Sequence, residues 1–325
     1  MKKRVLSGIQ PSGKLHIGNY LGAIRQHIDS QNQADWDRYF FIANYHSLTS
    51  HPDPETLREW TLDVARTYLA LGLDPEKSLL FMQTDVPEVT ELAWILTCLA
   101  PMGLLQRCTS YKDKVARGIE ANHGLFAYPV LQAADILIYD SHFVPVGSDQ
   151  KQHIEVCRDL AQKFNIRYGE TLVVPDGMIK DEVAVIPGID GQKMSKSYQN
   201  TIDLFGTKKE LKKQVMRIET DSKGLEEPKD PDTCNVFALY KFFANKEEIA
   251  EMAANYRAGG YGYGHAKLAL LEKLNHFLEP HRERYNHLVK NEDEVLDVLR
   301  AGAKTARATA QETMRRVRAA VGFIG

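Results

Sequence analysis

The sequence predicts an α/β protein: a doubly wound parallel sheet with an inserted connective segment, followed by a C-terminal all-helical domain. Short apolar runs with the length of buried strands alternate with segments of helical periodicity, which is the pattern of a parallel sheet covered by helices on both faces. After residue 206 only helical periodicity continues. We therefore expect an α/β domain over residues 1–206, with an insertion at about 102–125, and a helical domain over residues 207–325.

In the first half, strands and helices are expected to alternate in chain order. The predicted elements are a strand at 4–6, a helix opening at 18, a strand at 38–44, a helix at 54–71, a strand at 78–83 and a helix at 88–99. Asp53 and Pro54 supply an N-cap and a first-turn proline for the second helix, and Gly72 ends it. Because ligands bind beyond the carboxyl ends of parallel strands, His46 and Gln83 lie where a site is expected.

The charged segment from residue 102 to residue 122 reads as an insertion between the two halves of the sheet. The second half is expected to contain a helix at 126–139, a strand at 143–146, a helix at 149–164 and a strand at 183–186. Helices then follow at 208–220, 234–243, 246–256, 264–289 and 291–321, and the last of them is a candidate to pack back on the first domain. The glycine-rich stretch 259–265 has no strand before it, so we read it as a connection between helices.

Composition excludes several classes of protein. The formal net charge of −2 gives no overall attraction for nucleic acid, so any RNA contact must come from local patches. The four cysteines have no C-x-x-C spacing and read as reduced thiols, not as ligands of a protein-bound metal. No apolar run approaches the roughly 20 residues of a membrane span, and the chain starts with Lys2-Lys3-Arg4 and a strand, so we expect a cytoplasmic protein.

Two short motifs far apart in the chain carry most of the chemical information. The first stretch, residues 10–20, takes a strand through the turn Pro11-Ser12-Gly13 to a helix that opens at Gly18. A helix N-terminus offers free N–H groups and the positive end of the helix dipole, which suits a phosphate. The stretch lacks both the G-x-G-x-x-G spacing and the P-loop lysine. It contains His-Ile-Gly-Asn at residues 16–19 (the His16 motif), matched downstream by Lys-Met-Ser-Lys-Ser at residues 193–197 (the lysine loop).

The two motifs resemble the His-Ile-Gly-His and Lys-Met-Ser-Lys-Ser motifs with which class I aminoacyl-tRNA synthetases bind ATP. The similarity extends through Ser7–Gly13, Tyr128–Pro129, Ala133–Leu137, Val144–Gly147 and Gln152–His153. Within this class the chain looks most like the bacterial tryptophan-specific enzymes, over essentially its whole length. The resemblance implies a Rossmann-type catalytic domain, a helical anticodon-binding domain, and a homodimer whose contact is carried by the insertion.

The implied reaction joins L-tryptophan to ATP, with Mg²⁺, as tryptophanyl-adenylate, and then transfers the amino acid to the 3′ terminal ribose of tRNA(Trp). Such chemistry needs no protein nucleophile, because the enzyme orients two anions and stabilises the charge on the leaving pyrophosphate. Lys193 and Lys196 can close over the triphosphate, and His16 and Asn19 read as its hydrogen-bond partners. The resemblance assigns a third triphosphate lysine to Lys114, which by sequence alone would be a surface residue.

The ATP site implied by the resemblance draws on the first turn, the strand end near residue 147 and the lysine loop. Its residues are Gln10, Pro11, Ser12, Gly18, Asn19, Gly147, Asp149, Gln150, Val185, Ile186, Lys193, Met194, Ser195, Lys196 and Ser197. Gly147 permits close approach to the ribose and Asp149 can accept from its hydroxyls. A helix N-cap is the alternative role for Asp149.

The amino-acid pocket is expected between the first strand and the helix that carries Tyr128, Gln132 and Asp135, which share one helix face at i, i+4 and i+7. Asp135 lies among apolar residues and therefore needs a donor, either an indole N–H or a nearby backbone group. The resemblance gives Asp135 the indole, and Tyr128 and Gln150 the ammonium. The expected pocket residues are Leu6, Gly8, Gln10, His46, Tyr128, Gln132, Asp135, Ile136, Val144, Val146 and Gln150.

Two positions depart from the tryptophan pattern. Leu6 stands where many of those enzymes have an aromatic residue, and Gln132 stands where many have Met. Gln132 brings the helix close to the Tyr-x-x-x-Gln-x-x-Asp spacing of archaeal-type tyrosine enzymes, so tyrosine is the rival substrate. Leu6 speaks against tyrosine, because it cannot hydrogen-bond a phenol.

Two functions from other classes also remain open. A nucleotidyltransferase that uses only the His16 motif would be a short single domain. A noncatalytic RNA-binding paralogue should have lost His16 or the lysines. The basic residues of the last predicted helix are either a solvated face or a phosphate-contacting patch: Arg300, Lys304, Arg307, Arg315, Arg316 and Arg318.

Overall fold

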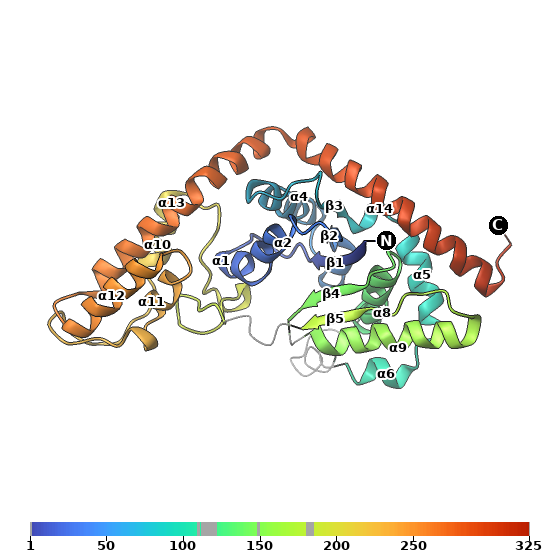
Figure 1. Cartoon of the computed structure of the whole chain (residues 1–325), viewed down its shortest axis with the longest axis horizontal. Coiled ribbons are helices and arrows are strands. Elements are labelled where there is room, and N and C mark those ends of the chain that lie inside the picture. Colours follow the sequence, from blue (N-terminus) through green and yellow to red (C-terminus); the bar gives the residue numbers. More distant parts are fainter. Residues whose placement is uncertain (1, 109–110, 112–121, 148–149, 180–184, 325) are drawn as a thin grey trace.

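The structure, a computed structural model, describes residues 2–108, 111, 122–147, 150–179 and 185–324. Its centre is a five-stranded sheet in the order β3-β2-β1-β4-β5, with every described pairing parallel. The strands are β1 (Lys3–Ile9), β2 (Trp36–Ile42), β3 (Leu79–Met82), β4 (Phe143–Val146) and β5 (Asp176–Ile179). Helices lie on both sides of this sheet, so the predicted doubly wound fold is confirmed (Figure 1).

The fifth strand was predicted at residues 183–186, of which 183 and 184 lie outside the described residues, and for the other two the prediction was wrong. Among the described residues of the predicted strand, Val185 and Ile186 lie outside any strand, and β5 forms earlier in the chain. β5 pairs with β4 along its whole length, from Phe143 opposite Asp176 to Val146 opposite Ile179. Val185 and Ile186 have high β-propensity, but propensity does not show which segment finds a partner strand, and β4 pairs with residues 176–179.

The helices of the sheet domain follow the predicted order. They are α1 (Ile17–Asn19), α2 (Arg25–Ser30), α3 (Asn44–Ser47), α4 (Pro54–Ala70), α5 (Glu88–Thr97), α6 (Met102–Gln106), α8 (His123–Leu137) and α9 (Lys151–Tyr168). The Asp53 side chain caps α4 by accepting from the Thr56 N–H, as its position predicted. One feature was not predicted: a π-helical turn, η1 (Tyr20–Ile24), joins α1 to α2. Two 3₁₀ turns follow strands β2 and β3 at η2 (Leu48–Ser50) and η3 (Gln83–Asp85).

From the end of the lysine loop onward, the regular elements of the described chain are helical. Its elements are η5 (Lys196–Tyr198), α10 (Lys208–Met216), η6 (Pro231–Thr233), α11 (Asn235–Tyr240), α12 (Lys246–Ala258), α13 (Tyr263–Lys290) and α14 (Glu292–Val321). Helices α10, α11 and α12 gather at one end of α13, away from the sheet, and α14 runs back to the sheet (Figure 1). No helix among the described residues has both the length and the apolar character needed to cross a membrane.

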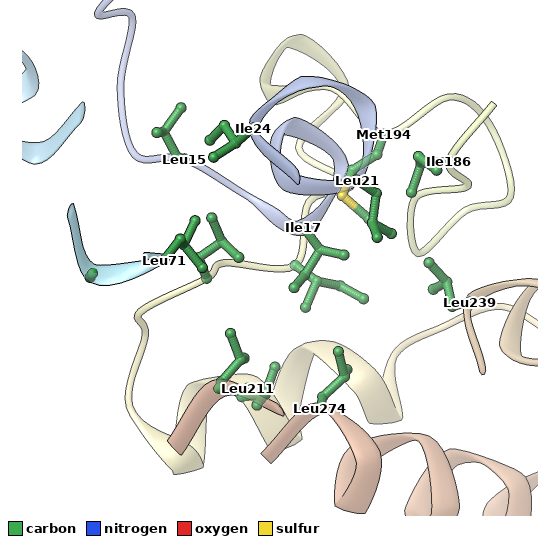
Figure 2. Packing of buried hydrophobic residues seen from close by; sticks show 14 of the residues in the cluster. Leu15, Ile17, Leu21, Ile24, Leu71, Ile186, Met194, Leu211, Leu239 and Leu274 are labelled. Carbon is green, nitrogen blue, oxygen red and sulfur yellow. The ribbon is translucent and has the colours of Figure 1, made fainter. Parts of the chain in front are cut away.

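Two hydrophobic clusters, one on each face of the sheet, hold these layers together. Alternate residues of β2 point to opposite faces, so Phe40 and Ile42 enter one cluster while Tyr39 and Phe41 enter the other. The first cluster also joins the helix of the His16 motif to the lysine loop and the C-terminal helices. Ile17, Met194 and Leu274 all belong to this cluster, and Figure 2 shows Ile17 between the other two in this view. This packing brings the two motifs to the same end of the sheet.

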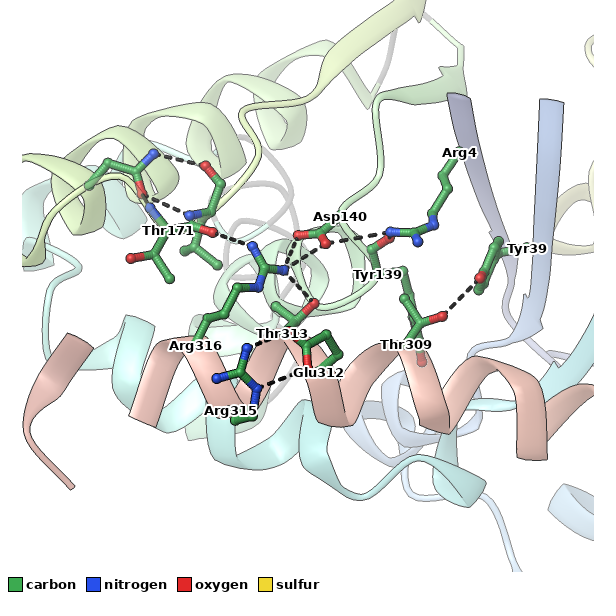
Figure 3. Close-up of polar contacts among 12 residues, drawn as sticks. Arg4, Tyr39, Tyr139, Asp140, Thr171, Thr309, Glu312, Thr313, Arg315 and Arg316 are labelled. Atoms are coloured by element: carbon green, nitrogen blue, oxygen red, sulfur yellow. Dashed lines mark hydrogen bonds and ion pairs between the residues drawn. The ribbon is translucent and has the colours of Figure 1, made fainter. Parts of the chain in front are cut away.

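Helix α14 packs against β3 and α5. The contact is close at Gly302, where an added Cβ would lie 2.2 Å from the Leu80 carbonyl oxygen. Tyr39 and Thr309 hydrogen-bond through their hydroxyls at 3.0 Å, and the Arg316 guanidinium donates to Asp140 (Figure 3). Most basic residues of α14 have acidic partners: Arg300–Asp297, Arg307–Glu88, Arg315–Glu312, Arg316–Asp140 and Arg318–Glu91. Arg307, Arg316 and Arg318 thus join α14 to the sheet domain. Arg300 and Arg315 pair with exposed carboxylates of their own helix, as on a solvated face.

Candidate active site

A cavity of about 490 Å³ opens at the carboxyl ends of the strands. It lies between β1, β4 and helix α8. Every residue predicted for the amino-acid pocket lines it: Leu6, Gly8, Gln10, His46, Tyr128, Gln132, Asp135, Ile136, Val144, Val146 and Gln150. Gly147, predicted for the ATP site, lines the same cavity.

The face of α8 that carries Tyr128, Gln132 and Asp135, at i, i+4 and i+7, borders the cavity. Asn122 begins this helix, because its side chain accepts from the Leu125 N–H at 2.8 Å. Tyr128, Gln132 and Asp135 then follow along the wall. Apolar side chains from β1 and β4, including Leu6 and Val144, stand on the other side of the cavity. An apolar slot with a few polar groups suits a flat aromatic side chain.

Asp135 is buried and accepts three hydrogen bonds. His46 Nε2 lies 2.8 Å from Oδ2, and Gln83 Nε2 lies 2.8 Å from Oδ1 and 2.9 Å from Oδ2. Burial raises the pKa of the Asp135 carboxyl, and the hydrogen bonds from His46 and Gln83 oppose that rise. The sequence placed Gln83 at a strand end but assigned it no role. Its position directly after a buried strand was the available signal.

A second chain of hydrogen bonds runs through His153, which the sequence analysis did not include among the site residues. The Tyr128 hydroxyl lies 2.7 Å from His153 Nε2, and His153 Nδ1 lies 3.0 Å from Gln150 Oε1. Because the Gln150 carbonyl oxygen can only accept, Nδ1 carries the proton and Nε2 accepts from Tyr128. His153 therefore fixes the orientations of Tyr128 and Gln150, the two residues that the resemblance gives to the ammonium.

The His16 motif is built around a buried imidazole. Burial lowers the pKa of His16 to about 4, with a further contribution from the Lys196 charge, so the ring is neutral at pH 7. Its Nδ1 has no hydrogen-bond partner among the described residues. The Asn19 side-chain oxygen accepts from the His16 backbone N–H at 3.1 Å. This bond fixes which way the Asn19 amide points and leaves its NH₂ group as the donor. Gly18 is required here, since an added Cβ would lie 2.9 Å from His16 Nδ1.

The lysine loop lies directly against this motif. Lys196 Nζ donates to the Gly13 carbonyl at 2.8 Å, and the Gly18 N–H points to Met194 Sδ at 3.2 Å. The Ser195 N–H donates to Asn200 Oδ1 at 2.7 Å, which holds the loop in its turn. Burial lowers the pKa of Lys196, while the Asp63 and Asp203 carboxylates act in the opposite direction.

The remaining predicted ATP residues lie at different depths around the two motifs. Pro11 is buried and its carbonyl accepts from the Ser47 hydroxyl at 3.0 Å, whereas Ser12 is exposed. Ile186 is buried and its carbonyl accepts from the Met194 N–H at 2.8 Å. Val185, Lys193 and Ser197 are also exposed at the surface. Lys114 and Asp149 lie outside the described residues.

Comparisons with known proteins point to one family. A family model described as tRNA synthetases class I (W and Y) matches residues 1–279. The chain is 54% identical over 324 residues, covering 99% of each chain, to a tryptophan–tRNA ligase of Fusobacterium nucleatum.

Solved structures give the same result. The crystal structure of tryptophanyl-tRNA synthetase from Campylobacter jejuni, complexed with ADP and tryptophan, has a TM-score of 0.94 at 50% identity, over 98% of this chain and 100% of that one. A tyrosyl-tRNA synthetase from Archaeoglobus fulgidus, complexed with L-tyrosine, shares the fold alone, with a TM-score of 0.64 at 19% identity over 87% of this chain and 90% of that one.

Proposed function

Because this chain belongs to the class I tRNA synthetases of the tryptophan and tyrosine family, we propose that it is a tryptophan–tRNA ligase. It activates L-tryptophan with ATP and transfers the product to the 3′ terminal ribose of tRNA(Trp). The observation that supports tryptophan as the substrate is the position of Asp135, a buried acceptor on the wall of a largely apolar cavity. Gln10 and Gly147 of the predicted ATP site line the same cavity. An indole ring needs such an apolar slot together with one acceptor for its N–H.

In the first step a tryptophan carboxylate oxygen bonds to the α-phosphorus of ATP, and the bond from that phosphorus to the β-phosphate bridging oxygen breaks. Negative charge builds up on the departing pyrophosphate. The unpartnered Nδ1 of His16 and the amide of Asn19 serve as hydrogen-bond partners for the phosphates, and Lys193 and Lys196 neutralise the charge. The Lys196 ammonium has three N–H donors and gives one to the Gly13 carbonyl, which leaves two for phosphate oxygens.

Magnesium enters this reaction as part of the substrate, bound to the triphosphate of ATP. Among the described residues, no group of three His, Cys, Asp or Glu side chains gathers to hold a metal ion. Phosphate oxygens and water are ligands that Mg²⁺ prefers. Lys114 and Asp149, which lie outside the described residues, complete the proposed ATP site as a third triphosphate lysine and a ribose acceptor.

The amino-acid end of the cavity supplies both polar contacts and apolar walls. Tyr128 and Gln150, held by His153, take the substrate ammonium, and Asp135 accepts the indole N–H. The side chains that contact the ring are Leu6, Ile136, Val144 and Val146, with Gly8, Gln10, His46 and Gln132 completing the lining. Leu6 offers the indole ring an aliphatic contact, whereas an aromatic residue at this position would stack on the ring.

Amino-acid-dependent pyrophosphate exchange, run with tryptophan and with tyrosine in separate reactions, tests this function. We expect exchange with tryptophan, because Leu6 on β1 cannot hydrogen-bond a phenol hydroxyl. Exchange with tyrosine alone would overturn the substrate assignment. No exchange with either amino acid would favour a noncatalytic paralogue. If exchange with tryptophan is found, charging of tRNA(Trp) tests the second step.

We propose further that residues 1–206 form the catalytic domain and residues 207–325 the anticodon-binding domain. α10, α11 and α12 lie away from the sheet (Figure 1), which supports this division, although α13 packs against α4 and α14 packs against β3 and α5. We also propose a homodimer through the insertion at 102–125, testable by the mass of the protein in solution. A cytoplasmic location fits the tRNA substrate and the four cysteines, all within the described chain and free of disulfide bonds.

A further inference from the structure

Gln83 lies directly behind Asp135 and does not line the cavity. It begins the turn η3 after β3 and is buried with 1% of its surface exposed. Both the carbonyl and the NH₂ group of its side-chain amide make hydrogen bonds. The carbonyl Oε1 accepts from the Tyr45 backbone N–H at 2.9 Å, and Nε2 donates to both oxygens of Asp135 at 2.8 and 2.9 Å.

The bond to Tyr45 fixes which way the amide points. A backbone N–H can only donate, so Oε1 must face Tyr45 and Nε2 must face Asp135. Tyr45 belongs to α3, which follows β2, while Asp135 belongs to α8. Gln83 therefore ties the ends of two neighbouring strands to the helix that carries the carboxylate. A neighbouring pair reinforces the junction, because Asn44 and Thr84 exchange two hydrogen bonds.

The three donated bonds divide unequally between the oxygens of Asp135. Oδ2 accepts from both His46 and Gln83, while Oδ1 accepts from Gln83 alone. An ionised carboxylate oxygen has about two acceptor directions. Oδ1 therefore retains one direction for a donor in the cavity that Asp135 lines.

We propose that Gln83 is a positioning residue for substrate selection, because its oriented amide clamps Asp135 so that one lone pair of Oδ1 meets the indole N–H. This inference rests on the proposed function and deepens it. Gln83 does not touch the substrate and acts only through Asp135. Burial by itself raises the pKa of Asp135 and so favours the protonated carboxyl. The hydrogen bonds from Gln83 act in the opposite direction and favour the carboxylate. A carboxyl that is protonated is a weaker acceptor for an indole N–H.

The test compares tryptophan with 3-benzothienyl-L-alanine, in which sulfur replaces the ring N–H with little change in shape. In Gln83→Met we expect the KM for tryptophan in pyrophosphate exchange to rise about tenfold or more, because the acceptor is no longer held. The KM for the analogue and the KM for ATP should stay within about threefold of the wild type. The KM of the variant for tryptophan should also rise as pH falls from 8 to 6, because the unclamped Asp135 protonates more easily.

Gln31 provides a matched control. Its Oε1 accepts from the Asp74 N–H at 2.8 Å and its Nε2 donates to the Gly72 carbonyl at 3.1 Å, so it is held at both ends as Gln83 is. It lies outside the cavity lining, and Gln31→Met should leave both KM values unchanged. If Gln83→Met does not fold, the same-sized variant Gln83→Glu replaces it, in which two carboxylates must share a proton and tryptophan binding should weaken further.

A KM that rises equally for tryptophan and the analogue would show that Gln83 only supports packing, and the inference would be wrong. A KM for tryptophan that does not change would also overturn it. Both results leave the proposed function standing. Failure of the wild-type protein to exchange pyrophosphate with tryptophan would instead overturn the proposed function itself.

Discussion

Lys196 and Gly13, which are 183 positions apart in the chain, are joined by a hydrogen bond of 2.8 Å from the lysine ammonium to the glycine carbonyl. This bond places the second lysine of the lysine loop over the turn that precedes the His16 motif. The same ammonium lies close enough to His16 to lower the pKa of its imidazole. Positive charge and a helix N-terminus thus lie side by side in the fold, an arrangement that reduces the reorganisation needed during reaction.

Replacing Lys196 by Met removes this charge but keeps much of the aliphatic side chain. We expect kcat for tryptophan-dependent pyrophosphate exchange to fall by about 10²–10³, with little change in the KM for tryptophan, since Lys196 does not line the cavity. Steady-state exchange assays measure both. Lys212→Met, on the exposed side of α10, is the control and should retain full activity. A Lys196 variant as active as this control would remove the loop from the catalytic mechanism.

The buried His16 gives the fold a specific dependence on pH. Its folded-state pKa is about 4, below the value of 6.5 for an exposed histidine. The unfolded chain therefore binds a proton more readily, and the contribution of His16 to stability is fully present above pH 6.5 and is lost as pH falls from 6.5 to 4. The slope from this group reaches at most about 1.4 kcal/mol per pH unit.

Denaturant unfolding of the wild type and His16→Asn across pH 4–7 measures that contribution. The free energy of unfolding of the wild type, relative to the variant, should decline as pH falls through this window. Parallel curves would mean that His16 is accessible to protons in the folded protein.

Asp135→Asn should damage both the pocket and the fold. The asparagine side chain has one acceptor oxygen where Asp135 has two, so an N–H of His46 or Gln83 faces the new amide group. Leaving a buried donor unpaired costs about 1–3 kcal/mol of unfolding free energy. The KM for tryptophan should rise about tenfold to a hundredfold, since a hydrogen bond to a charged group is lost. Calorimetry and exchange assays test the two effects separately, and a KM that does not change would exclude Asp135 as the acceptor of the ring.

Gly302→Ala should destabilise the junction between α14 and the sheet. The new methyl group would lie 2.2 Å from the Leu80 carbonyl oxygen, so the helix must move away from β3. Overpacking of this kind costs about 1–3 kcal/mol. Gly264→Ala, in the first turn of α13, meets no atom within 4 Å and should be neutral or stabilising by up to about 1 kcal/mol. Equal unfolding midpoints for the two variants would contradict this account of the α14 contact.

The sequence predicted the alternation of strands and helices because buried strands and amphipathic helices have distinct periods. The same reasoning failed for the fifth strand, since the apolar character of residues 183–186 says nothing about which segment reaches the edge of β4. The π-helical turn after Asn19 also left no pattern that could be read from spacing. For the fifth strand, the outcome depends on hydrogen-bond partners that are distant in the chain.

The candidate site shows the same limit at the level of single side chains. The spacing of Tyr128, Gln132 and Asp135 was enough to place them on one wall of the cavity. The partners of Asp135 were not predictable in this way, because Gln83 and His46 are 52 and 89 residues away from it. The burial of Asp135 required a donor, and only the folded chain shows that the protein supplies three hydrogen bonds itself.

The return of α14 to the sheet has a consequence for synthesis on the ribosome. β3 is an edge strand, and the helix that packs on it begins more than 200 residues later, at Glu292. Until those residues leave the exit tunnel, the nascent sheet presents an uncovered border on which other chains can add strands. The yield of folded protein therefore depends on how long this edge stays uncovered during translation.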